Sequence, residues 1–121
     1  MSKPHIRYFN VAMIPIHFGF TTSKAAFRRE MKRLGVTEPD DHILHGADGT
    51  THSFTREGEN TTVIVCMRRG KDLQNIALAV HEAVHVWQHA KQALYCGDDD
   101  EIMAFSIQYF AEVLLHELGI R

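Results

Sequence analysis

The segment Thr61–Met67, with the sequence TTVIVCM, is β-branched or apolar at every position. Such a run is typical of a central strand that is buried on both faces of a sheet. Residues 72–95 follow this segment and carry apolar side chains mostly at three- and four-residue intervals, which predicts a long helix. A buried strand that leads into such a helix indicates an α+β fold.

A second strand is predicted just before the buried one. Residues 50–56 alternate in character and lie between the turn pairs Asp48-Gly49 and Glu57-Gly58. Paired with residues 61–67 as a hairpin, they would form the edge of the sheet.

The N-terminal part of the chain adds strands and a helix. Residues 5–9 and 11–20 are apolar and partly β-branched, which predicts one or two short strands. A helix over residues 24–34 is expected next, with Thr22 or Ser23 as its N-cap, since a hydroxyl can accept from the first free amides.

The chain is expected to close on a last helix over residues 101–118. Asp98, Asp99 and Asp100 precede it, where the helix dipole favours negative charge. No repeat or Pro/Gly/Ser-rich linker interrupts the sequence, so residues 1–121 are interpreted as one domain.

Composition excludes several classes of function. With 13 Lys and Arg against 15 Asp and Glu, the net charge of −2 argues against sequence-independent binding to nucleic acid. The apolar runs are far shorter than the ~20 residues of a membrane span, and the N-terminus lacks a secretory signal, so a cytoplasmic location is expected. Cys66 and Cys96 are far apart, which favours buried, reduced thiols over a disulfide.

The long helix contains an H-E-x-x-H motif made by His81, Glu82 and His85. Histidines four residues apart project from the same face of a helix, so both imidazoles can reach one metal ion. Glu82 is placed to take a proton from a water that the metal polarises and to pass it to a leaving amine. The alternative is a helix that carries two exposed histidines by accident.

A catalytic zinc site needs a third protein ligand. Gln88 and Lys91 replace the glycine and histidine of the extended metzincin motif, which excludes that scheme. His89 would lie about 12 Å along the axis from His81, too far to share an ion. Glu101 is the better candidate, because the final helix should run back along the active helix. Alternatively, Glu101 only favours the helix N-terminus by its charge.

The two motifs, His81-Glu82-x-x-His85 and then Glu101-Ile102-Met103-Ala104, resemble those of gluzincin zinc metallopeptidases in their minimal single-domain form. That family places a Glu-x-x-Ala-like stretch on the helix after the active one. A zincin-like fold is implied, in which a backing helix and a small twisted sheet precede the active-site helix and a C-terminal glutamate helix. The stretches 81–88 and 101–108 are also similar to small phage-encoded proteins.

The resemblance implies a role for each matching residue. His81, His85 and Glu101 would be the ligands of one Zn²⁺ ion, and Glu82 the general base. Residues 50–56 would be the edge that pairs with extended substrate, which makes His52, Ser53 and Phe54 substrate-binding candidates. Larger relatives supply an oxyanion-stabilising Tyr or His from a later subdomain; the candidates here are Tyr109, His116, His45 and Tyr95.

The sequence thus predicts a zinc-dependent peptidase with a shallow, open cleft, acting on a peptide or protein. The alternative is an inactive relative, a zinc-containing module that captures a partner peptide on its edge strand. The oligomeric state stays open, because Trp87, Phe105 and Phe110 could face a core or a partner.

Overall fold

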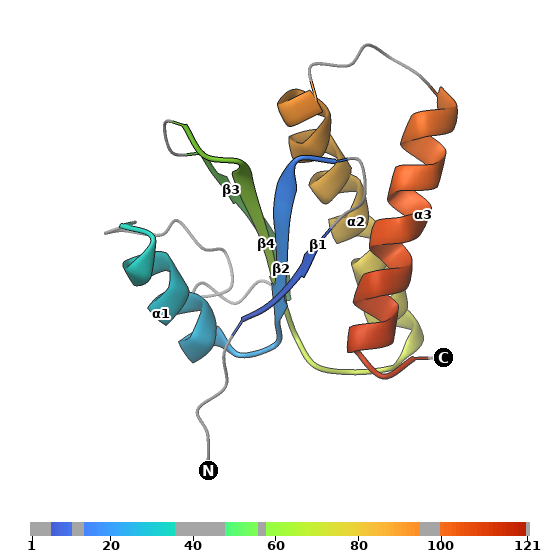
Figure 1. Cartoon of the computed structure of the whole chain (residues 1–121). Helices are drawn as coiled ribbons and strands as arrows, with labels where there is room; N and C mark the ends of the chain where they lie inside the picture. The colour runs from blue at the N-terminus through green and yellow to red at the C-terminus, as the bar shows by residue number, and fades with distance from the viewer. Residues whose placement is uncertain (1–5, 11–13, 36–47, 56–57, 95–99, 121) are drawn as a thin grey trace.

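The computed structural model describes residues 6–10, 14–35, 48–55, 58–94 and 100–120 (Figure 1). Within these residues it contains one four-stranded sheet and three helices, which confirms the predicted α+β class. In chain order the elements are β1 (Arg7–Asn10), β2 (Ile16–Thr21), α1 (Lys24–Arg33), β3 (Gly49–Phe54), β4 (Thr61–Met67), α2 (Leu73–Leu94) and α3 (Asp100–Glu117).

The sheet is mixed, with the strand order β1-β2-β4-β3. β3 and β4 pair antiparallel as the predicted hairpin, and β3 is an edge strand as expected. β1 and β2 are also antiparallel, whereas β2 and β4 run parallel with α1 in the connection between β2 and β3. β4 is therefore a central strand, and its residues 63–67 are all buried.

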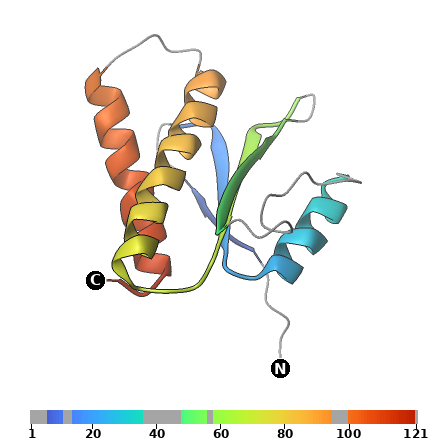
Figure 2. The same ribbon diagram turned by 180° about the vertical axis from the view of Figure 1, so that it is seen from behind.

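The helices cover the two faces of the sheet unequally (Figures 1 and 2). α1 packs on one face, where Phe27 and Met31 meet Ile64 and Cys66 of β4 in a small cluster. α2 and α3 pack side by side on the other face, over the larger core. That core includes Phe18, Val63, Val65, Ala83, Trp87, Phe110 and Leu114.

Local sequence explains where α1 begins. Ser23 is the N-cap, and its Oγ accepts a hydrogen bond from the amide of Ala26 at 3.1 Å. This contact satisfies one of the amides that have no partner in the first helical turn. Of the two predicted caps, Ser23 is the one the structure uses.

The small residues of α2 allow it to lie close to the sheet. Ala79, Ala83 and Ala90 are fully buried on its inner face. β3 contributes as well, because a Cβ atom at Gly49 would lie 3.3 Å from the Leu78 side chain. The lack of a side chain at Gly49 therefore permits close contact between α2 and the edge strand.

Two further predictions concern the cysteines and the absence of a membrane-spanning segment. Cys66 is buried, as expected, while Cys96 lies outside the described residues. Among the helices described, none combines the length and the apolar character that crossing a bilayer requires.

Candidate metal centre

α2 presents His81 and His85 on one face, one turn apart. Their Nε2 atoms lie 3.1 Å from each other, and their ring centroids are 4.7 Å apart. His81 is exposed and His85 is half-buried, so the space before the two nitrogens is reachable from solvent. The structure therefore brings together the two histidines that the motif predicts as ligands.

The separation of the two nitrogens suits zinc. Two ligand nitrogens at the usual Zn–N distance with a tetrahedral angle lie about 3.3 Å apart, close to the 3.1 Å between His81 and His85. In addition, Nδ1 of His85 is 2.8 Å from Oε1 of Gln88. An amide oxygen only accepts, so Nδ1 donates and the proton stays away from Nε2. His85 thus directs a lone pair towards His81.

Glu82 lies between the two histidines in sequence but on a different side of α2. Its side chain is buried, with the residue only 3% exposed. The hydroxyl of Thr51 on β3 donates a hydrogen bond to Oε2 of Glu82 at 2.8 Å. This contact fixes the carboxylate of the motif against the edge strand, 31 residues away in sequence.

Among the described strands, β3 is an outer one, and its outer edge runs beside this contact. The carbonyl of Asp48 accepts from the amide of Arg68 at 2.8 Å, which makes these two a hydrogen-bonded pair at the end of the ladder. Hydrogen-bonded and non-hydrogen-bonded pairs alternate along antiparallel strands. The main-chain groups of Gly49, Thr51 and Ser53 therefore point to the open side of the sheet.

The three predicted substrate-binding residues do not share one face. The rings of His52 and Phe54 are stacked, with centroids 6.2 Å apart, and His52 is 5.4 Å from the ring of Phe27 on α1. Both side chains therefore lie on the face opposite to Glu82. Ser53 alternates with them and shares the face of Thr51, because side chains of a strand alternate between faces.

Glu101 lies on α3, the helix that follows the one carrying the histidine pair. It is exposed in the first turn of α3, which begins beside the C-terminal end of α2 (Figure 1). His85 is nine residues before the last residue of α2, or about 13 Å along the axis. Within the described ranges, no three His, Cys, Asp or Glu residues form a group that could hold a metal. Glu101 as third ligand stays a prediction, and Ala104 beside it is exposed as well.

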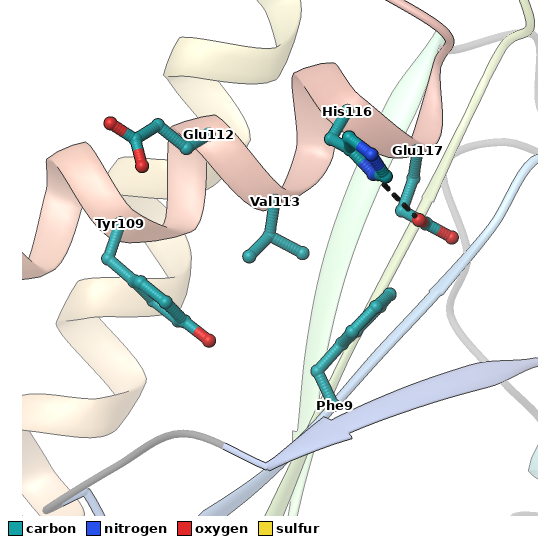
Figure 3. Close-up of a pocket in the computed structure, with 6 residues that line it drawn as sticks. All are labelled: Phe9, Tyr109, Glu112, Val113, His116 and Glu117. Carbon is teal, nitrogen blue, oxygen red and sulfur yellow. Dashed lines mark hydrogen bonds and ion pairs between the residues drawn. The ribbon is translucent and has the colours of Figure 1, made fainter.

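Of the four candidates for stabilising the oxyanion, the structure describes Tyr109 and His116. Both lie near β1, at the edge of the sheet opposite to β3. Tyr109 and His116 line a pocket of about 350 Å³ between α3 and Phe9 of β1 (Figure 3). β1 and β3 are the two outer strands, so this pocket and Glu82 are separated by the width of the sheet. His45 and Tyr95 lie outside the described residues.

His89 lies one turn beyond His85 and is half-buried. Burial lowers the pKa of its imidazole, and the charge of His85 lowers it further. Both effects favour a neutral ring in the folded protein.

Two contacts of the site were not anticipated from the motif. Gln88 is three residues after His85, so helical spacing alone could have suggested its contact. Thr51 belongs to the predicted edge strand, but no local pattern relates it to Glu82, because that contact depends on how α2 packs on β3.

No family model, no curated protein and no solved structure matches this chain.

Proposed function

We propose that this protein is a small zinc-dependent peptidase of the gluzincin type. The observation that carries the proposal is the geometry of one helix turn on α2. Two imidazole nitrogens 3.1 Å apart face each other, and the carboxylate between them in sequence is held against an edge strand. Histidine nitrogens at this separation are a suitable pair of zinc ligands.

The arrangement of the elements supports the same proposal. A backing helix, α1, and a small mixed sheet precede α2, and the edge strand β3 runs beside the motif. An extended peptide could add to β3 through the outward main-chain groups of Gly49, Thr51 and Ser53. Recognition by main-chain groups would favour extended peptides over particular side chains.

The chemistry would divide between the metal and the chain. Zinc, when held by His81 and His85, would lower the pKa of a water in its open position towards neutrality. Glu82 would accept the proton of that water on one carboxylate oxygen, while Thr51 holds the other. The water oxygen would bond to the carbonyl carbon of the peptide, and as the carbon–nitrogen bond breaks the same carboxylic acid would donate the proton to the departing amine, leaving a carboxylate and an amine as products.

The second candidate is the zinc-containing peptide-binding module. Its supporting observation is the state of Glu82, which is 3% exposed and already accepts a hydrogen bond from Thr51. A carboxylate used to connect α2 to β3 could have a structural role only. In that case the edge strand would bind a partner peptide without cleaving it.

Zinc content and cleavage together test the proposal. Elemental analysis should find about one equivalent of zinc in the wild type and none in His81→Ala. Glu82→Gln should retain zinc, since its amide oxygen can still accept from Thr51, but should no longer digest a broad peptide library. A wild-type protein without zinc would contradict both candidates, whereas zinc and peptide binding without cleavage would support the module.

The third ligand can be tested in the same way. Glu101→Gln should lower the affinity for zinc if this carboxylate is a ligand. Glu112→Gln is the matched control, because Glu112 is an exposed carboxylate of the same helix and lines the pocket near β1. Equal zinc affinity in the two variants would remove Glu101 from the ligand set.

A further inference from the structure

Two successive contacts align the edge strand β3 with α2. At Gly49, an added Cβ atom would lie 3.3 Å from the Leu78 side chain, so the strand lies directly against this turn of the helix. Two residues further along β3, the hydroxyl of Thr51 donates to Oε2 of Glu82 at 2.8 Å. Two residues of a strand and four residues of a helix both advance by about 6 to 7 Å. The two contacts are therefore in step, and they hold β3 beside the turn of α2 that leads into the motif.

The hydroxyl of Thr51 is a specific partner for the carboxylate of Glu82. Glu82 is only 3% exposed, so water has little access to replace this hydroxyl as a donor. A buried carboxylate oxygen is costly to leave without its donor, and the side chain would turn towards another donor or towards solvent if the hydroxyl were removed. Thr51 thus holds the carboxylate of the motif in one orientation.

The main chain of Thr51 faces the outer edge of the sheet. Hydrogen-bonded pairs alternate along β3 and β4, which directs the amide and the carbonyl of Thr51 outward. A peptide that adds antiparallel to β3 would bond with both groups through one of its own residues. Such pairing restricts the backbone dihedrals of Thr51 and, through its Cα–Cβ bond, the direction of its hydroxyl.

We propose that Thr51 is a positioning residue that couples peptide binding at the β3 edge to the alignment of Glu82. This inference rests on the peptidase proposed above, in which Glu82 is the general base. The main chain of Thr51 would bind the substrate, while its side chain holds the carboxylate that acts on that substrate. The preferred substrate is therefore an extended peptide with an unsubstituted amide opposite Thr51, and this pairing would accelerate cleavage as well as strengthen binding.

A structural role of Thr51 alone predicts a different kinetic pattern. Removal of a contact that only joins β3 to α2 would lower the melting temperature and weaken peptide binding through a distorted edge. Removal of a contact that positions Glu82 would lower kcat and leave KM close to its wild-type value, because the main chain of β3 still binds the peptide.

Steady-state kinetics of the zinc-loaded protein separate these two roles. Thr51→Val keeps the shape of the side chain without the hydroxyl, and it should lower kcat about ten- to a hundredfold with KM changed by less than about threefold. Thr51→Ser retains a hydroxyl and should restore most of the activity. Thr61→Val is the matched control and should keep the wild-type kcat, because Thr61 lies on β4 and its hydroxyl is 2.8 Å from that of Thr55. This control loses a hydrogen bond of the same length elsewhere in the sheet.

A scan of the substrate main chain tests the coupling. In peptides of one sequence, N-methylation at a single position removes one amide donor. At the position opposite Thr51, it should lower kcat and raise KM in the wild type. In Thr51→Val, methylation at the same position should raise KM only, because the link to Glu82 is already broken.

The outcomes distinguish this inference from the proposed function. A wild type that binds zinc but cleaves no peptide would contradict the peptidase and the role of Thr51 together. Cleavage by the wild type with an unchanged kcat in Thr51→Val, or a loss that Thr51→Ser does not restore, would overturn the role of Thr51 and leave the peptidase standing. If Thr51→Val does not fold, the wild-type scan decides alone: N-methylation that raises KM without lowering kcat at any position would overturn the coupling.

Discussion

The hydrogen bond between His85 and Gln88 determines which nitrogen of the His85 imidazole can bind a metal. Neutral histidine carries its proton on one of two nitrogens, and only the other can bind a metal. With Nδ1 donating to Gln88 at 2.8 Å, the lone pair lies on Nε2, which faces His81 at 3.1 Å. A partner of this kind both orients the ring and raises its basicity as a ligand.

Gln88→Leu should therefore weaken zinc binding about tenfold without loss of the fold. The reason is that the other tautomer, with the proton on Nε2, becomes accessible in the variant. Competition with a chromophoric chelator measures the affinity, and nitrogen chemical shifts of the metal-free protein report the tautomer.

Two variants control this prediction at the residue scale. Gln88→Glu should restore affinity, because a carboxylate also accepts from Nδ1. Gln92→Leu, one turn further along α2 and exposed, should bind zinc like the wild type. Equal affinities in Gln88→Leu and Gln92→Leu would show that the contact has no influence on the metal.

At the scale of elements, Asn75 connects the end of β4 to the start of α2. The residue is fully buried, and its Nδ2 donates to the carbonyls of Arg68 and Gly70 at 3.2 and 2.7 Å. Its Oδ1 accepts from Nε of Arg68 at 2.9 Å. The Asn75 side chain thus provides hydrogen-bond partners for main-chain carbonyls of the connecting loop and sets the direction in which α2 leaves the sheet.

Asn75→Leu should destabilise the protein by about 2–4 kcal/mol, because two partly buried carbonyls lose their donor. For a chain of this size the melting temperature would fall by about 10 °C. Differential scanning calorimetry measures the change, and Gln74→Leu at the neighbouring exposed position should shift it by less than about 2 °C. Similar melting temperatures in both variants would mean that the network does not stabilise this connection.

At the scale of the whole molecule, the two edges of the sheet have different surroundings. The β3 edge lies beside Glu82 through its contact with Thr51, whereas the β1 side holds the pocket lined by α3. The strands β2 and β4 lie between these two edges of the sheet and keep the regions apart.

Zinc should stabilise the entire fold if it binds the native protein and not the unfolded chain. At a free concentration one hundred times the dissociation constant, the gain is about 2.7 kcal/mol, which raises the melting temperature by about 10 °C. A chelator should reverse this shift. His81→Ala should show no zinc-dependent shift, while His17→Gln, an exposed histidine of β2, should behave like the wild type.

Much of the secondary structure was predictable because its causes are local. The alternation before β4, the apolar run of β4 and the periodicity of α2 each depend on neighbours within a few residues. The N-cap of α1 follows from one hydroxyl three residues before an amide. The helical spacing of His81 and His85 likewise brings their side chains together without help from the rest of the fold.

The positions of Glu82, Glu101 and Tyr109 relative to one another had no such local cause. Helical spacing could not show that Glu82 meets Thr51, or how the start of α3, with Glu101, lies relative to the histidine pair. Nor could it place Tyr109 near β1 and Glu82 near β3.

The sequence by itself therefore determined the elements of this protein and the pair of histidines on α2. Only the tertiary structure decided which strand holds Glu82, which face His52 and Phe54 occupy, and where the α3 residues lie. The physical reason is that periodicity and capping act over a few residues, whereas contacts such as Thr51 with Glu82 join residues far apart in sequence and exist only after helices and strands have packed.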